Sequence, residues 1–271
     1  MVEFYEHYLN KDLEYFAISS DYAQGLAHFL KEVNLSDYPE INFVKGHIIG
    51  PVSFGLSVTD EKNKAIFYNA ELSDAALKLL TMKVLWQVSE LKKKVKDSRI
   101  IIFIDEPYLT SIGSSYIVID ASSVINKLNE IINALKEYDV ICGIHCCGNT
   151  DWSILAKTNA DIISFDAYNY SESLSLYPEE IKAFLNRGGM LAWGVVPSSE
   201  EVLSLDLDKI KISLKERMSL LEKKGISQKS LLKSSLITPS CGLGTLSEEL
   251  ADRVIELTVK LSEEMTEDIN E

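Results

Sequence analysis

The chain has 271 residues, of which 46% are hydrophobic and 25% are charged, and four cysteines are too few for a disulfide framework. The net charge of −14 makes nucleic acid and anionic lipid poor partners. No apolar run approaches the roughly 18 residues of a membrane span, and the first residues lack the features of a signal peptide. We therefore expect a globular protein in a reducing, cytoplasmic setting, where thiols serve metal binding or catalysis.

Six apolar runs along the chain are predicted to be buried strands. They cover Ile41 to Ile49, Arg99 to Ile104, Val140 to His145, Asp161 to Phe165, Met190 to Val195 and Leu232 to Ile237. Amphipathic patterns between them predict helices over Asp74 to Val95, Ser122 to Tyr138, Glu179 to Asn186, Glu200 to Lys224 and Ser247 to Met265. This alternation of strand and helix predicts right-handed crossovers and a parallel sheet.

Residues 1–40 read as a helical and irregular lead-in, with no convincing strand before Ile41. A TIM-type (β/α)8 barrel has eight parallel strands, whereas the pattern here gives six. We therefore expect one TIM-type barrel domain over residues 1–271 that lacks its first two strands in this chain. An open barrel exposes strand edges and apolar surface. We predict that the chain associates with itself or with a small partner chain that completes the barrel.

Several strands end in residues that carry chemistry, and in parallel α/β folds ligands bind at the carboxyl ends of the strands. The residues in these positions are Asp105 with Glu106, His145 with Cys147, Asp166, and Cys241. Four strand ends of this kind predict a single site.

His145, Cys147 and Cys241 offer one imidazole and two thiols, a mixed donor set that suits Zn²⁺. Because side chains alternate along a strand, His145 and Cys147 point to the same side, with Gly143 leaving room beside them. Three protein ligands leave a fourth position for a substrate. The remaining cysteines, Cys142 and Cys146, point to the other side and are expected to be small core residues.

The charge of this donor set favours thiol chemistry. Two thiolates balance Zn²⁺, so a substrate thiol held there loses its proton and stays nucleophilic enough to attack an activated methyl group. A hydrolase would favour fewer thiolates, because they weaken the pull of the metal on water. Asp166 is a candidate for a weak additional ligand that the substrate displaces.

Asp105 and Glu106 are expected to bind an amine of the substrate, although acids after a strand also mark the start of a helix. Single histidines on strands and helices are more often structural than catalytic. We therefore expect His47 to be a hydrogen-bonded core group, and His7 and His28 to be structural.

Taken in order, the motifs resemble the catalytic domain of cobalamin-independent methionine synthase, within the wider superfamily of uroporphyrinogen decarboxylase and the methylcobalamin:coenzyme M methyltransferases. The resemblance covers about residues 11–265. It rests on Gly50-Pro51-Val52, Ile104-Asp105-Glu106-Pro107, His145-Cys146-Cys147, the segment from Asp161 to Asp166, and the segment from Pro239 to Leu243. The chain is most similar to the short core-type methionine synthases, which are thought to take methyl groups from a corrinoid protein.

The resemblance implies zinc-dependent transfer of a methyl group from a methylcorrinoid such as methylcobalamin, or from methylfolate, to homocysteine. It implies that His145, Cys147 and Cys241 are the zinc ligands, that Asp166 occupies the place of a glutamate ligand, and that Asp105 binds the amino group of the substrate. The histidine proton donor of the long enzymes has no counterpart between Trp193 and Pro197. This argues against folate, because a cob(I)alamin leaving group needs no proton.

The front motifs by which this family holds the carboxylate and amine of homocysteine are absent from the chain. Two alternatives therefore stay open. One is methyl transfer from methylcobalamin to a coenzyme M-type thiol, which has no amino group. The other is a non-catalytic subunit that holds zinc and binds a corrinoid protein. The decarboxylase branch fits less well, because it needs no zinc.

Overall fold

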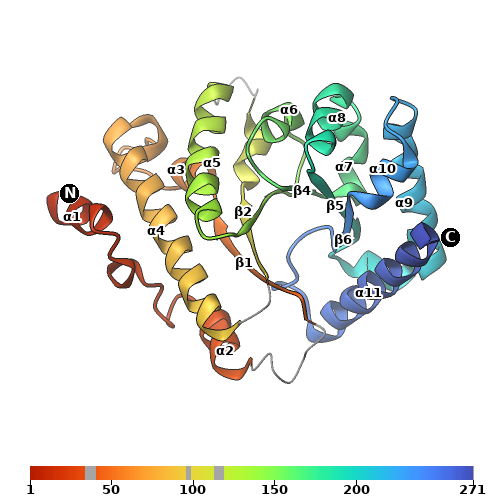
Figure 1. The fold of residues 1–271 in the computed structure, drawn as a ribbon, viewed down its shortest axis with the longest axis horizontal. Coiled ribbons are helices and arrows are strands. Elements are labelled where there is room, and N and C mark those ends of the chain that lie inside the picture. The colour runs from red at the N-terminus through yellow and green to blue at the C-terminus, as the bar shows by residue number, and fades with distance from the viewer. Residues whose placement is uncertain (34–40, 96–98, 113–118, 271) are drawn as a thin grey trace. The chain divides into compact units, whose positions relative to one another are not determined.

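The computed structural model describes residues 1–33, 41–95, 99–112 and 119–270 of the chain, which fold into α-helices and one β-sheet (Figure 1). Within these residues the sheet has six strands, hydrogen-bonded in chain order from β1 to β6. They are β1 (Phe43–Ile49), β2 (Arg99–Asp105), β3 (Ile141–Cys146), β4 (Ile162–Phe165), β5 (Met190–Val196) and β6 (Ser235–Pro239). The pairings of β1 with β2, β4 with β5, and β5 with β6 are parallel, as predicted. This α/β architecture is compatible with part of a TIM-type barrel.

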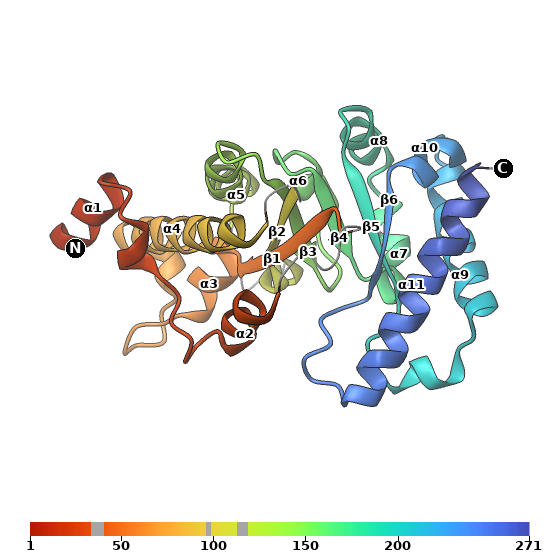
Figure 2. The ribbon, with the colours of Figure 1, turned by 60° about the horizontal axis from the view of Figure 1, so that its bottom comes forward.

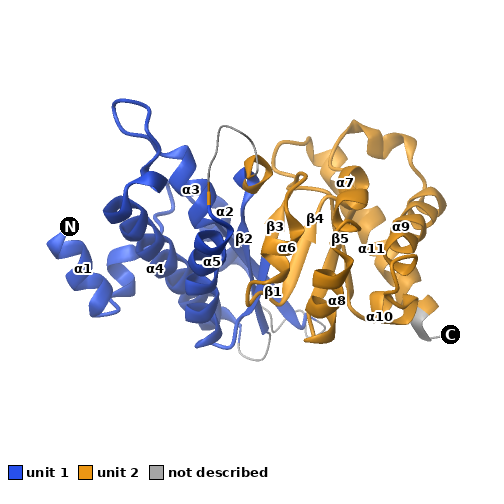
Figure 3. Ribbon diagram, turned by 90° about the horizontal axis from the view of Figure 1, so that it is seen from above, with its two compact units in different colours: residues 1–108, 120–143 blue, residues 109–119, 144–271 orange. Residues whose placement is uncertain are grey.

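The chain divides into two compact units (Figure 3). The first comprises Met1–Tyr108 and Asp120–Gly143, and the second comprises Leu109–Ile119 and Ile144–Glu271. Strand β3 runs from one into the other. The sequence pattern indicated no boundary, and a single barrel domain over 1–271 stays a prediction.

The helices of the first unit gather around the long helix α4. They are α1 (Val2–Leu9), α2 (Gln24–Glu32), α3 (Pro51–Ser57), α4 (Ala70–Lys94) and α5 (Ala121–Lys136). Helix α4 begins where the Asn69 side chain accepts hydrogen bonds from the backbone N–H groups of Glu71 and Leu72. It contacts β1, β2 and α5, and its fully buried Val84 and Val88 lie in the core of this unit.

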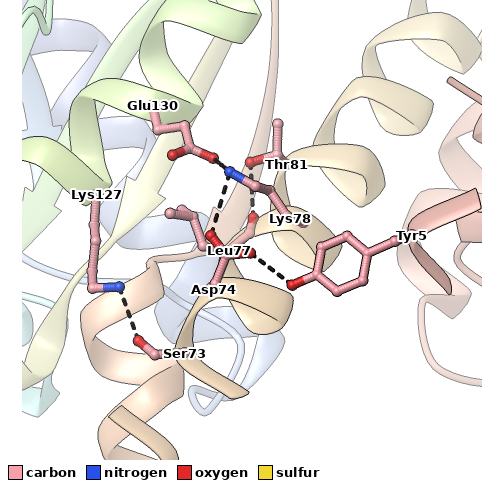
Figure 4. A network of polar contacts seen from close by, with 8 residues as sticks. All are labelled: Tyr5, Ser73, Asp74, Leu77, Lys78, Thr81, Lys127 and Glu130. Carbon is pink, nitrogen blue, oxygen red and sulfur yellow. Dashed lines mark hydrogen bonds and ion pairs between the residues drawn. The ribbon is translucent and has the colours of Figure 1, made fainter. Parts of the chain in front are cut away.

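A network of polar side chains joins three of these helices (Figure 4). Lys78 of α4 forms an ion pair with Glu130 of α5 and lies 3.6 Å from Asp74 Oδ1. The hydroxyl of Tyr5, in α1, donates to Asp74 Oδ2 at 2.7 Å. This hydrogen bond to a carboxylate raises the pKa of Tyr5 to about 12. The N-terminal helix is thus attached to α4.

Strand β1 is buried on only one of its faces, which corrects the prediction of a buried strand over Ile41 to Ile49. Val44 and Ile48 are buried beneath the helices, whereas Phe43 is 48% exposed and Ile49 is 38% exposed. Because β1 is the first strand in the sheet, none of the described strands pairs with its outer edge. An exposed apolar edge strand of this kind favours association.

The second unit is built around β4, β5 and β6. Its helices are α6 (Trp152–Ala156), α7 (Ala167–Leu174), α8 (Pro178–Asn186), α9 (Leu207–Glu222), α10 (Gln228–Lys233) and α11 (Glu248–Asn270). Helices α7, α9 and α11 contact β5, and α11 runs alongside β6 (Figure 2). The buried ring of Phe165 lies 5.7 Å from the ring of Trp152 and 5.1 Å from that of Trp193. These edge-on aromatic contacts pack the last residue of β4 against α6 and against the middle of β5.

Two of the predicted elements have other bounds in the structure, because a helix begins or ends there. The last strand begins at Ser235, because the residues before it belong to α10. The single helix predicted over Glu200 to Lys224 is interrupted, because the Asp206 side chain accepts from the Lys209 N–H and starts α9. Among the described residues, no helix has the length and apolarity needed to cross a membrane.

Candidate metal centre

The structure brings together the three residues that were predicted as zinc ligands. The donor atoms of His145, Cys147 and Cys241 all lie within 4.8 Å of one another, in the second unit. His145 belongs to β3, Cys147 follows that strand, and Cys241 follows β6. Across the described part of the chain, no other three His, Cys, Asp or Glu side chains meet this criterion.

His145 is oriented by a neighbouring strand. Its Nδ1 lies 3.0 Å from the hydroxyl oxygen of Ser164, a buried residue of β4. With Nδ1 engaged, Nε2 is the ring nitrogen left for a metal. Ligating histidines commonly use their second nitrogen in this way, which fixes the plane of the ring.

The backbone of Cys241 is held by two serines. The Ser198 hydroxyl accepts from the Cys241 N–H at 3.0 Å and donates to the Cys241 carbonyl at 2.9 Å. The Ser240 hydroxyl accepts from the Ser198 N–H at 3.0 Å. Ser198 lies just beyond β5, so these hydrogen bonds join the ends of β5 and β6. Although Cys241 is exposed, its position is therefore fixed by the backbone.

The turn that carries Cys147 is anchored on both sides. Before it, Cys146 is fully buried, as predicted for the side of β3 opposite to His145. After it, the Thr150 hydroxyl donates to the Leu109 carbonyl at 2.9 Å. The Asp151 side chain then accepts from the Ser153 N–H and starts α6. Cys142 is fully buried as well, so both remaining cysteines are core residues.

The two thiols of the group are electrostatically coupled. A hydrogen bond with Cys147, together with one to His145, lowers the pKa of Cys241 to about 4. The hydrogen bond with Cys241 and burial raise the pKa of Cys147 above its ordinary value. One thiolate is thus favoured in this group, and a divalent cation would favour ionisation of the second.

The donor set fits Zn²⁺. Tetrahedral coordination with ordinary Zn–S and Zn–N bonds places ligand atoms about 3.5–3.8 Å apart, so donor atoms within 4.8 Å need only small side-chain shifts. One imidazole and two thiols suit this borderline-soft ion. The group leaves one tetrahedral position without a protein donor, which is typical of catalytic rather than structural zinc sites.

Asp166, predicted as a weak additional ligand, is not part of this close group. It caps the start of α7: its carboxylate accepts from the Asn169 N–H at 2.9 Å and from Asn169 Nδ2 at 2.8 Å. Burial raises the pKa of this carboxyl, and these hydrogen bonds oppose the rise. Binding of a metal by the Asp166 carboxylate would compete with its hydrogen bonds at the start of α7. The role of Asp166 as a metal ligand stays a prediction.

Asp105 and Glu106 lie in the first unit, at the end of β2. Asp105 Oδ2 lies 2.9 Å from Nδ1 of His47. The expectation that His47 is a core group is wrong, because its side chain is 68% exposed. His47 lies on the face of β1 that stays exposed, although the residues around it in the sequence are apolar. The sequence pattern alone does not show that this face is exposed.

Glu106 is fully buried and interacts with α3. Its carboxylate accepts from the backbone N–H of Val52 at 2.9 Å and from the N–H of Ser53 at 2.7 Å. The Ser53 hydroxyl also donates to it, at 2.6 Å. Burial raises the pKa of Glu106 to about 7, although these hydrogen bonds lower it. A contact between Glu106 and substrate stays a prediction.

No protein-family model matches this chain, and no curated protein sequence matches it either. The resemblance of the motifs to methionine synthases therefore remains an expectation, and the geometry of the site has to carry the functional argument.

Sequence reasoning missed the serines of the site. Ser164 stands in the middle of a strand, and Ser198 follows another. The only feature of the sequence that points to these serines is their position inside or directly after apolar strands, where a polar side chain needs a hydrogen-bond partner. Which partner each finds depends on the neighbouring strand, and the sequence does not reveal that.

Proposed function

We propose that this protein is a zinc-dependent methyltransferase that acts on a thiol. The observation that supports this proposal is the convergence of His145, Cys147 and Cys241 within 4.8 Å. Zn²⁺ bound there would supply a positive charge that deprotonates a substrate thiol, while two cysteine thiolates keep that sulfur electron-rich.

The residues of the chain orient this centre. The Ser164 hydroxyl holds the imidazole of His145, and Ser198 holds the backbone of Cys241. The position without a protein donor is where the substrate sulfur would bind. This arrangement preorganises the thiol for attack on a methyl carbon.

In the proposed reaction, a C–S bond forms while the bond between the methyl group and its carrier breaks. The electron pair of that bond leaves with the carrier, and the thiol proton passes to solvent. The most economical donor is a methylcorrinoid, because its cob(I)alamin leaving group needs no proton donor. Homocysteine is the proposed thiol, and binding of its amine by Asp105, a residue of the first unit, stays a prediction.

Methyl transfer to a thiol without an amino group is a second candidate. The observation that favours it is the hydrogen bond between Asp105 and His47, which already uses one carboxylate oxygen. In a third candidate, a subunit that holds zinc and binds a corrinoid protein, the metal would be present without turnover.

The test combines metal analysis with methyl transfer. We expect the purified protein to contain one zinc per chain and to demethylate methylcobalamin in the presence of homocysteine, monitored by the visible spectrum of the corrinoid. The variant Cys241→Ser should lose most of the metal and the activity. The variant Cys142→Ala, which changes a core cysteine, should keep both.

Each outcome distinguishes the candidates. Transfer to 2-mercaptoethanesulfonate but not to homocysteine would favour the amine-free thiol. Zinc without transfer to any thiol would favour the binding subunit. Absence of stoichiometric zinc from the wild-type protein, or zinc retained equally by Cys241→Ser, would refute the proposed centre.

A further inference from the structure

The first unit contains a second feature that the proposed methyl transfer does not use. A cavity of about 520 Å³ lies at β1, α2 and α4. Its size is within the range of about 300–1,000 Å³ that is usual for small-molecule sites. Leu26 and Phe29 of α2 and Leu91 of α4 give it apolar walls, and Lys45 and His47 of β1 contribute polar groups.

Lys45 supplies a positive charge to this cavity. Its side chain is accessible to solvent, yet it lies along a concave wall, and the resulting desolvation lowers the pKa of the ammonium group. The ammonium nitrogen lies 5.1 Å from the centre of the Phe103 ring. Among the described residues no side chain forms a hydrogen bond or ion pair with the Lys45 ammonium group, although the Asp105 carboxylate interacts with it electrostatically. An anionic ligand group would supply a direct hydrogen-bonded partner.

His47 supplies a hydrogen-bond acceptor. A carboxylate can only accept, so the hydrogen bond to Asp105 at 2.9 Å requires a proton on His47 Nδ1. In the neutral ring this leaves the lone pair of Nε2 on a side chain that is 68% exposed. His47 and Lys45 are two positions apart on one face of β1, about 6.6 Å along the strand. A small ligand can therefore reach both.

We propose that this cavity binds a small aliphatic hydroxy acid. The carboxylate pairs with Lys45, the ligand hydroxyl donates to His47 Nε2, and the aliphatic chain lies against Leu26, Phe29 and Leu91. A hydroxyl suits this site better than an ammonium group, because Lys45 repels a second positive charge and the Asp105 carboxylate is already hydrogen-bonded to His47. This binding site uses none of the proposed zinc ligands, although His47 is hydrogen-bonded to Asp105, the residue predicted to bind the amine of the thiol substrate.

The test measures binding of 2-hydroxyhexanoate to the full-length protein by calorimetry or by ligand-observed NMR. Hexanoate, which lacks the hydroxyl group, should bind about fivefold more weakly, and 1,2-hexanediol, which lacks the carboxylate, at least tenfold more weakly. The variant Lys45→Met should weaken binding at least tenfold, whereas Lys45→Arg should retain most of it. The variant His47→Leu should bind 2-hydroxyhexanoate no better than hexanoate.

The matched controls are Lys64→Met and His28→Leu, which change side chains of the first unit that do not line the cavity. They should bind as the wild type does. Thermal unfolding of each variant checks that it is folded. The proposal is overturned if wild type does not bind 2-hydroxyhexanoate, if folded Lys45→Met binds it undiminished, or if 2-aminohexanoate binds more tightly. Zinc content is measured in the same samples, so failure of the metal centre and failure of this cavity are seen separately.

Discussion

A single hydroxyl group, that of Ser164, orients the imidazole of His145, a proposed zinc ligand. The hydroxyl oxygen lies 3.0 Å from Nδ1 of the imidazole, and Ser164 is buried. A buried partner of this kind favours one ring orientation, so that a metal, if bound, would meet a ligand that is already ordered.

We expect Ser164→Ala to weaken zinc binding by about 10- to 100-fold, which is the usual effect of removing a hydrogen-bond partner from a metal ligand. Competition with a chromophoric zinc chelator measures this change. The variant Ser164→Thr keeps the hydroxyl and should stay closer to wild type. Equal zinc affinity in the wild type and in a folded Ser164→Ala would show that the hydrogen bond does not orient the ligand.

At the scale of elements, Glu106 joins the end of β2 to the start of α3. Its carboxylate accepts from the backbone of Val52 and Ser53, and the Ser53 hydroxyl in turn accepts from the Tyr108 N–H at 3.0 Å. Gly50 is required beside it, because a Cβ atom there would lie 2.2 Å from the carboxyl group. This packing buries the carboxyl away from solvent, which is why its pKa is raised.

The raised pKa of Glu106 predicts a pH dependence of stability. In the unfolded chain the carboxyl ionises near its ordinary value of 4.5, whereas in the folded protein it holds its proton until about pH 7. The unfolded state therefore binds fewer protons between these values, and the free energy of unfolding falls as the pH rises through this window. The loss amounts to about 3 kcal/mol and is complete about one pH unit above the pKa of the folded state.

Urea denaturation of the wild type and of Glu106→Gln at several pH values measures this effect. The variant cannot ionise at this position, so the difference in stability between the two proteins should change by about 3 kcal/mol between pH 4.5 and pH 7.5. The variant is expected to be less stable at low pH, since its amide cannot accept as many hydrogen bonds from α3. A difference that is constant with pH would contradict the raised pKa.

At the scale of the whole molecule, the exposed apolar residues at the two ends of β1 predict association. Phe43 and Ile49 are 48% and 38% exposed on that strand. Apolar side chains beside an unpaired strand edge are usually covered by another chain. We expect light scattering after size-exclusion chromatography to detect a species larger than one chain.

The double variant Phe43→Lys with Ile49→Lys should shift this species to a single chain, because charged side chains on an edge strand oppose pairing. The control Leu176→Lys changes an exposed apolar residue of the second unit, 72% exposed, and should leave the assembly intact. A well-folded wild-type protein that is a single chain at all concentrations would contradict the prediction.

Local sequence patterns were sufficient to predict much of the fold and part of the candidate site. The six strands were predicted within a few residues, because apolar runs between amphipathic stretches have no other way to bury their side chains. The placement of His145 and Cys147 on one side of β3 follows from the two-residue repeat of a strand. The start of β6 was missed, because the apolar residues before Ser235 complete a helical turn and periodicity does not distinguish such short segments.

The sequence by itself determined which residues form strands, that the strands alternate with helices, and that the proposed zinc ligands lie at or just after strand ends. Only the tertiary structure decided which of those residues meet. It brought Cys241 to His145 and Cys147, left Asp166 capping α7, and exposed His47 beside Asp105. The physical reason is that backbone periodicity acts over a few residues, whereas burial and hydrogen bonding between strands depend on contacts between residues far apart in the chain.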